Sequence, residues 1–201
     1  MKRKIIIASG SESRKKLVKS IGFNFLFEKS EYKKDMTEKL SARKLAQKLA
    51  LGKAQDVAQK HPNAIIIGID SFVILDDEFL GKPHTPQEAR VMLKKMSGKK
   101  HESIAGIAII DTKNEKVVTD YETTGVWINK LTDKEIEDYV RTGEPLNKAG
   151  SYAIQKLGCI LIDKIDGNYT NVLGLPVNKL YKHLIKLGVN ILEEPYCKTD
   201  S

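Results

Sequence analysis

The chain has 201 residues, of which 41% are hydrophobic and 30% charged, and its formal net charge is +8. This composition is that of a globular domain, and no apolar run approaches the roughly 18 residues that a membrane helix needs. The positive charge favours anionic partners such as nucleotides, whereas aromatic residues make up only 6% and do not alternate with basic ones, which argues against a nucleic-acid groove.

The amino-terminal segment predicts a strand, a turn and a helix. Residues 5–8 are apolar, the turn from Ser9 to Ser11 breaks the strand, and residues 12–21 follow as a helix. Such a turn leaves backbone N–H groups free at the start of a helix, where phosphate groups bind well. The hydroxyl groups of Ser9 and Ser11 add donors, although the same side chains would serve equally well as helix caps.

An acid lies between two apolar runs in the next part of the chain. A strand at residues 25–27, a polar loop at 29–40 and a helix from Ser41 towards Lys60 precede it. Residues 64–69 then end on Asp70, and residues 72–75 form the second run, so we expect two buried strands around an acid. A buried carboxylate is costly unless it is paired, bound to a metal or used chemically, and a structural acid bonded to backbone amides is the alternative.

The remaining elements alternate between strands and helices. We expect a hairpin turn at Asp76-Asp77, a helix after a capping box at 85–88, strands at 104–110 and 117–128, a helix after a second capping box at 132–135, a strand at 159–162 and a last helix after Pro176. This order predicts a mixed α/β fold with helices around one mixed sheet, formed by residues 1–201 as a single domain with two lobes.

Several residues are expected to have no chemical role. The two cysteines give neither a metal spacing nor a disulfide framework, so Cys159 is expected to be a small core residue. The four histidines are scattered and expected to be solvated, and residues 189–201 form a tail expected to be poorly ordered. The apolar part of the amino terminus is too short for a signal peptide, which predicts a cytoplasmic protein.

Cleavage of a phosphate anhydride needs cations or backbone donors for the phosphates, carboxylates for a divalent metal, and a base that directs water at phosphorus. The chain offers candidates for each part: the turn at 9–14 with Arg14, then Lys82, with Lys53 or Lys148, and Asp70 with a partner from Glu31 or Asp35. Each has a structural alternative. Arg14 would otherwise be a solvated first-turn residue, Lys82 part of a surface turn, and Gln155 a satisfied core amide.

Short motifs along nearly the whole chain resemble those of Maf proteins. They are ASGSESR (8–14), GIDS (68–71), LGKP (80–83), MSG (96–98), TGEP (142–145), KAG (148–150), YAIQ (152–155) and NVLGLP (171–176). Each motif is weak singly, but their order and spacing are specific. Maf proteins are nucleoside triphosphate pyrophosphatases with an elongated, twisted mixed sheet of the inosine-triphosphate-pyrophosphatase type, with two lobes and a central cleft.

The resemblance implies hydrolysis of a nucleoside triphosphate to the monophosphate and pyrophosphate with Mg²⁺ or Mn²⁺, by a cytoplasmic homodimer. It implies that Asp70 accepts the proton of the attacking water near the metal and that Lys82 belongs to the catalytic site. The segment ending in Gln155 is similar to that of members acting on dTTP and UTP, whereas members preferring 7-methyl-GTP differ there. The implied substrate-binding residues are Ser9, Ser11, Ser13, Arg14, Lys53, Ser71 and Gln155, and the implied metal ligands are Asp70 with Glu31 or Asp35.

The chain departs from the family pattern at three places. Glu12 and Ser13 replace a proline and an arginine in the serine–arginine turn, and that arginine bears on substrate choice. Ser71 replaces a threonine and keeps the hydroxyl group. Lys33 and Lys34 align with an acidic pair of the loop. Asp35 is therefore the expected second acid, and Glu31 is the alternative.

Other functions stay open from sequence. One is the same chemistry on ITP, XTP or modified pyrimidine nucleotides, which the altered turn at Ser13 allows. Another is a non-catalytic regulator of cell division that binds a nucleotide or a protein, which the positive charge and the changed loop allow. A direct nucleic-acid binder comes third.

Overall fold

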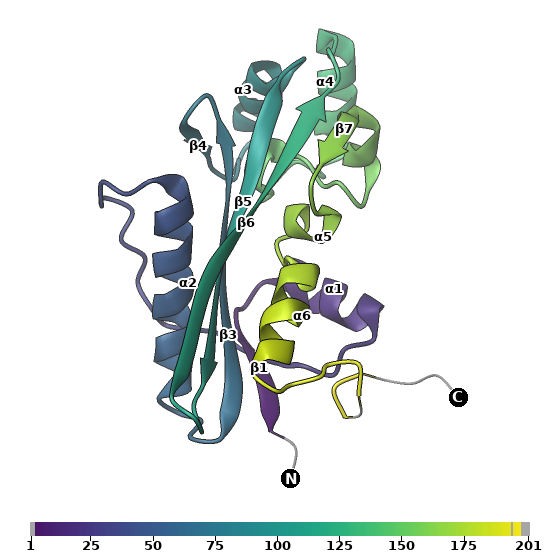
Figure 1. Cartoon of the computed structure of the whole chain (residues 1–201). Coiled ribbons are helices and arrows are strands. Elements are labelled where there is room, and N and C mark those ends of the chain that lie inside the picture. Colours follow the sequence, from purple (N-terminus) through teal and green to yellow (C-terminus); the bar gives the residue numbers. More distant parts are fainter. Residues whose placement is uncertain (1–2, 194, 198–201) are drawn as a thin grey trace. The chain divides into compact units, whose positions relative to one another are not determined.

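The computed structural model describes residues 3–193 and 195–197, which form a seven-stranded sheet with helices (Figure 1). The strands are β1 (Lys4–Ala8), β2 (Leu26–Glu28), β3 (Ala64–Leu75), β4 (Glu78–Leu80), β5 (Lys100–Asp111), β6 (Lys116–Ile128) and β7 (Ile162–Asp166). The α-helices are α1 (Glu12–Ile21), α2 (Ala42–Ala58), α3 (Pro86–Met96), α4 (Asp133–Arg141), α5 (Tyr169–Val172) and α6 (Val177–Lys186). Two 3-10 turns, η1 (Ala149–Ser151) and η2 (Leu157–Leu161), complete the set.

The sheet is mixed, which confirms the predicted fold class. Its order is β2-β1-β3-β5-β6-β7, with β4 paired to β3. Strand β1 runs parallel to β2 and β3, whereas β4 is antiparallel to β3 and β7 is antiparallel to β6.

The chain divides into two compact units. Unit 1 takes the described residues of Met1–Ser71, Ala105–Glu122 and Leu173–Ser201, and unit 2 takes Phe72–Ile104 and Thr123–Val172. Strands β3, β5 and β6 each begin in one unit and end in the other.

Unit 1 is built on strands whose two faces are both apolar. Because side chains alternate along a strand, odd and even positions of β1 and β3 face opposite sides. The odd-numbered isoleucines, with α1 and α6, form one core cluster, which includes Ile5, Ile7, Ile65, Ile67, Val18, Leu180 and Leu184. The even-numbered residues pack against α2 in another, which includes Ile6, Ile66, Ala50, Ala54 and Val57. Figure 1 shows α2 and α6 on opposite sides of these strands.

Helix α2 approaches the sheet closely because the contact residues are small. A Cβ atom on Gly68 would lie 2.0 Å from the carbonyl oxygen of Ala50, and one on Gly106 would lie 2.1 Å from that of Ala46. Alanine recurs every fourth residue on this face of α2, at positions 46, 50 and 54. The helix backbone therefore lies directly on β3 and β5.

Strand β3 runs unbroken from Ala64 to Leu75, so the prediction of two strands around Asp70 was wrong. Asp70 has an even number, so its side chain lies on the face of β3 that α2 covers. Lysine side chains neutralise the carboxylate there, and the strand therefore continues through this residue. The predicted hairpin is confirmed, since Asp76 and Asp77 both have positive φ and β4 pairs with β3.

Both predicted helix starts of unit 2 are present. Thr132 and Glu135 form the complete capping box of α4. At α3, the Thr85 hydroxyl accepts from the Glu88 N–H, but the Glu88 carboxylate accepts instead from the N–H of His84, at 2.7 Å, so only half of this capping box forms.

The interior of unit 2 holds a histidine that was expected in solvent. His101 is buried, with Nε2 at 2.8 Å from the hydroxyl of Tyr152. Burial lowers the pKa of His101 to about 4, so the imidazole is neutral. The expectation of four solvated histidines was therefore wrong for this one, because β5 turns position 101 inward.

Residues 157–161 form the turn η2, and the strand predicted at 159–162 begins only at Ile162. The Glu144 carboxylate accepts from the N–H groups of Gly158, at 2.8 Å, and Leu157, at 3.3 Å, which takes these donors out of any sheet. Cys159 is exposed on this turn rather than buried in the core.

Part of the predicted loose tail packs into unit 1. Val189, Ile191 and Tyr196 are buried in the cluster that α1 and α6 share. The N–H of Asn24 donates to the carbonyl oxygen of Tyr196 at 2.7 Å. The prediction was wrong for these residues, because their apolar side chains cover the end of that cluster, while positions 194 and 198–201 lie outside the described residues.

Candidate active site

The turn before α1 is organised by its two serines. The Ser9 hydroxyl oxygen accepts from the N–H of Ser11 at 3.2 Å, and Ser11 caps the helix by accepting from the N–H of Arg14 at 3.5 Å. Helix α1 begins at Glu12, as predicted, and Ser13 in its first turn is partly exposed. The capping role is thus present, and it leaves the amino-terminal end of a ten-residue helix next to the turn.

Arg14 is buried rather than solvated. Its Nη1 donates to the Ser9 hydroxyl and its Nη2 to the Ser71 hydroxyl, both at 3.0 Å, and its Nε donates to the carbonyl oxygen of Gly174 at 2.7 Å. Burial lowers the pKa of Arg14 to about 10, which the nearby Asp70 partly offsets. A guanidinium bonded to neutral oxygens keeps its positive charge available to an anion.

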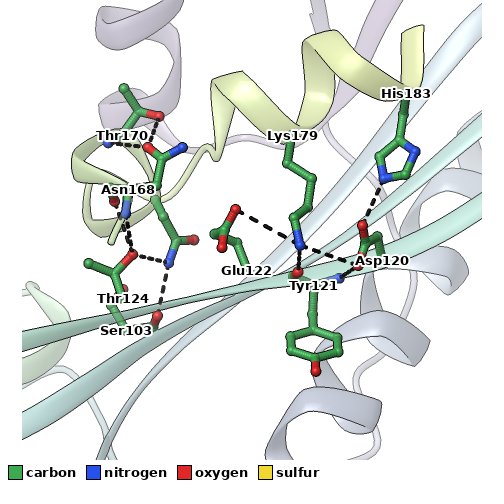
Figure 2. Close-up of polar contacts among 10 residues, drawn as sticks. Ser103, Asp120, Tyr121, Glu122, Thr124, Asn168, Thr170, Lys179 and His183 are labelled. Carbon is green, nitrogen blue, oxygen red and sulfur yellow. Dashed lines mark hydrogen bonds and ion pairs between the residues drawn. The ribbon is translucent and has the colours of Figure 1, made fainter. Parts of the chain in front are cut away.

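Gly174 comes from the segment before α6, which was a matched motif but not a predicted site position. Its φ of +90° is a backbone conformation that suits glycine. Helix α6 is tied to β6, since His183 Nε2 lies 2.8 Å from Asp120 Oδ2 and Lys179 Nζ lies 3.4 Å from Asp120 Oδ1 (Figure 2). Lys179 also donates to the carbonyl oxygen of Tyr121. These contacts fix the helix that follows the Gly174 carbonyl group.

A separate network in unit 2 holds α5. Asn171 Nδ2 donates to the carbonyl oxygen of Ser103 at 2.9 Å and to Thr124 Oγ1 at 3.1 Å. Thr124 Oγ1 also donates to the carbonyl oxygen of Asn168 at 3.0 Å (Figure 2). The NVLGLP motif therefore begins on a side chain that anchors the chain to β5 and β6.

Asp70 is 2% exposed, and its two carboxylate oxygens have different surroundings. Oδ1 pairs with Lys53 of α2 and with Lys34, whose Nζ lies 2.7 Å away. Oδ2 is buried and has no hydrogen-bond partner among residues 3–193 and 195–197. Because an unpartnered buried oxygen is costly, this atom is the best placed in the cluster to accept a proton or to bind a cation.

Lys53 reaches Asp70 from the helix that lies on β3. Its Nζ also donates to the carbonyl oxygen of Ile69 at 3.2 Å. Burial lowers the pKa of Lys53 to about 8, and Asp70 partly offsets this effect. The predicted residues of unit 1 thus fall on two faces of β3: Ser71 with Ser9 and Arg14, and Asp70 with Lys53.

The two acids predicted as further metal ligands make local contacts. The Asp35 carboxylate accepts from Thr37, at 2.9 Å from the N–H and 2.7 Å from the hydroxyl group. Glu31 is exposed and lies 3.9 Å from Lys29 Nζ. In the described part of the chain, no three His, Cys, Asp or Glu side chains gather as a metal site.

Lys82 and Gln155 are exposed residues of unit 2. The carbonyl groups on either side of Lys82 are held, since the N–H of Gly150 donates to Gly81 at 3.3 Å and that of Asn147 to Pro83 at 2.9 Å. Lys82 therefore projects from a fixed backbone. Gln155 lies outside the core, so the alternative of a buried amide is wrong.

Lys34, unlike Lys53, is a contact of Asp70 that is not among the residues predicted for the site. It lies in the loop at residues 29–40, at a position where the family pattern has an acid. No periodicity marks which of the six lysine residues at positions 29, 33, 34, 39, 44 and 48 would reach a strand distant in sequence.

The cluster around Asp70 carries more positive than negative charge. The carboxylate of Asp70 pairs with the cations of Lys34 and Lys53, and the positive charge of Arg14, near the other face of β3, also acts on it. Such a cluster suits a polyanion and offers one buried oxygen as a proton acceptor.

No helix of the described residues is both long and apolar enough to cross a membrane.

A family model and curated relatives both match most of the chain. A family model described as Maf-like protein matches residues 4–187. The dTTP/UTP pyrophosphatase of Methanosarcina mazei is 41% identical over 195 residues, covering 96% of this chain and 99% of the relative. That of Thermoanaerobacter sp. is 44% identical over 179 residues, covering 89% and 93%.

A solved structure supports the fold. The structure of the Staphylococcus aureus Ham1 protein matches with a TM-score of 0.53 and 14% identity, covering 92% of this chain and all of that one. At this identity the likeness shows the architecture alone.

Proposed function

The chain belongs to the Maf family, and from this membership we propose that it hydrolyses dTTP and UTP to the monophosphate and pyrophosphate. The curated relatives named dTTP/UTP pyrophosphatase, at 41% and 44% identity, support this choice of substrate. The observation that carries the chemistry is Asp70 Oδ2, a buried carboxylate oxygen without a hydrogen-bond partner among the described residues. It lies in a cluster of cations that suits a triphosphate.

In the proposed reaction, the phosphates bind at the start of α1, by the N–H groups of its first turn and the side chains of Ser11 and Ser13. Ser9 and Ser71 hold Arg14, and its positive charge with that of Lys53 attracts the triphosphate. Gln155 contacts the base. These roles follow from the family motifs and are supported by the bonds around Arg14.

Asp70 accepts a proton from water as the water oxygen bonds to the α-phosphorus. The bond between this phosphorus and the bridging oxygen of the β-phosphate breaks, and pyrophosphate leaves with the electron pair. Lys82 neutralises the negative charge that develops on the phosphates.

A divalent cation, Mg²⁺ or Mn²⁺, is part of the proposal. The unpartnered Asp70 Oδ2 fits one ligand position, and Asp35 or Glu31 is the proposed second. Mg²⁺ is commonly held by one or two carboxylates with substrate phosphates and water. When bound, the ion neutralises phosphate charge and activates water. A cytoplasmic homodimer is likewise proposed.

Release of pyrophosphate from a panel of triphosphates tests the substrate. We expect dTTP and UTP to be hydrolysed with the highest kcat/KM, and ITP, XTP, dCTP and 7-methyl-GTP with lower values. Hydrolysis of ITP or XTP in preference would move the specificity to noncanonical purines. Nucleotide binding without hydrolysis, with Mg²⁺ or Mn²⁺, would favour a non-catalytic regulator.

Asp70→Asn tests the base. This variant keeps the size of the side chain but removes the proton acceptor, so we expect turnover of dTTP to fall by about 10²–10⁴-fold. Circular dichroism should show a folded protein. Asp77→Asn, in the exposed hairpin turn where asparagine suits the positive φ of 63°, is the matched control and should retain activity. Turnover of Asp70→Asn equal to that of the control would refute the assignment.

A further inference from the structure

Lys34 and Lys53 share one oxygen of Asp70 but are held differently. Lys53 is 15% exposed, lies within α2 and has a second acceptor in the carbonyl oxygen of Ile69. Lys34 is 43% exposed and lies in residues 29–40, which contain no helix or strand. Lys53 is therefore fixed by the fold, whereas Lys34 can leave Asp70 without disturbing an element of secondary structure.

The charge of the cluster favours such a departure when a polyanion arrives. Arg14, Lys34 and Lys53 give three positive charges against the single carboxylate of Asp70. A triphosphate offers Lys34 several anionic oxygens in place of one that Lys53 already neutralises. A free divalent cation, by contrast, is repelled by these positive charges as it approaches Asp70.

We propose that Lys34 caps Asp70 in the free protein and transfers to the phosphates of a bound triphosphate. The exchange is one of ion-pair partners, and no covalent bond changes. It rests on the proposed function, because it gives Asp70 the role of proton acceptor. Its consequence is that Oδ1 of Asp70 loses one of its two cations when substrate is present, and that Lys34 competes with a divalent cation for this carboxylate.

Binding of Mn²⁺ to the protein without nucleotide, measured by electron paramagnetic resonance, tests the cap. We expect Lys34→Gln to bind Mn²⁺ at least about tenfold more tightly than the wild-type protein, equal to about 1.4 kcal/mol. Lys33→Gln removes the same charge from the adjacent exposed position and should change the affinity much less. In the Asp70→Asn background, Lys34→Gln should have no such effect.

Binding of a non-hydrolysable dTTP analogue, with a methylene bridge between the α- and β-phosphates, tests the transfer. We expect its dissociation constant to rise about tenfold in Lys34→Gln, since one phosphate ion pair is lost, and less in Lys33→Gln. Equal effects of the two variants on Mn²⁺ or on the analogue would overturn the proposal, as would tighter Mn²⁺ binding that persists in Asp70→Asn.

Failure of the proposed function would look different. If the wild-type protein hydrolyses no triphosphate but Lys34→Gln still tightens Mn²⁺ binding through Asp70, the cap stands and the hydrolase assignment falls. If dTTP is hydrolysed and the two lysine variants behave alike, the hydrolase assignment stands and the cap falls. Thermal melting of each variant checks that this exposed substitution leaves the fold intact.

Discussion

Arg14 is a buried charged residue that makes no direct ion pair within residues 3–193 and 195–197. Three of its N–H directions end on neutral oxygens, those of Ser9, Ser71 and Gly174. Since the planar guanidinium group has fixed donor directions, a lysine would satisfy fewer of these acceptors. The position of the cation therefore depends on residues from three separate parts of the chain.

Ser71 is expected to act as a positioning residue for Arg14. Ser71→Ala removes the oxygen that accepts from Nη2, so we expect the free energy of unfolding to fall by about 1–3 kcal/mol. The KM for dTTP should rise more than kcat falls, because the displaced Arg14 binds the triphosphate and takes no part in the chemical step. Ser71→Thr keeps the oxygen and should restore both values. Urea denaturation and steady-state kinetics measure them, and a threonine variant as impaired as the alanine variant would contradict this role.

At the scale of elements, the contact between α2 and β3 brings Lys53 to Asp70. The contact depends on glycine in the strand and alanine in the helix, which let the two backbones approach. Large side chains would separate them, and the lysine would no longer reach the carboxylate. The small residues of α2 thus help to place Lys53 beside Asp70, although none of them touches the substrate in the proposed reaction.

Gly68→Ala tests this packing. Its Cβ would lie 2.0 Å from the Ala50 carbonyl oxygen, so α2 would have to move, and we expect a loss of about 3 kcal/mol in the free energy of unfolding. Gly81→Ala is the matched control, because nothing lies within 4 Å of its added Cβ, and it should change stability by less than about 0.5 kcal/mol. Equal urea midpoints for the two variants would refute close packing at Gly68.

At the scale of the whole molecule, the stability of the fold is linked to pH through His101. An unfolded histidine has its usual pKa of 6.5, whereas burial lowers the pKa of His101 to about 4. Between these values the unfolded chain binds a proton that the folded chain does not. The free energy by which the neutral His101 favours the folded chain is therefore fully present above pH 6.5, and it is lost as the pH falls towards 4.

His101→Phe should remove this dependence. From pH 6.5 to pH 4, we expect the wild-type protein to lose about 3 kcal/mol more of its free energy of unfolding than the variant does. Urea denaturation across this range measures the difference, and His101→Gln provides a second neutral variant if phenylalanine packs poorly. His84→Gln, at an exposed histidine, is the control. A constant difference between His101→Phe and the wild-type protein across the range would contradict the buried, neutral imidazole.

Local signals predicted most elements of the fold. Helix α1 was placed at its observed bounds, since a cap and an apolar period mark it, and Thr132 with Glu135 marked the start of α4. The errors came where a distant partner decides the conformation. Glu144 takes the N–H groups of residues 157 and 158 out of a strand, and the apolar cluster of unit 1 takes up Tyr196.

Short-range patterns and motifs were enough to predict the order of elements, the family and Asp70 as the candidate acid. The meeting of Lys34 and Lys53 on one oxygen of Asp70, and the bonds from Arg14 to Gly174 and Ser71, arise only when the chain folds. These contacts join residues far apart in the chain. They depend on strand register and on how closely a helix lies on a sheet, which no local pattern records.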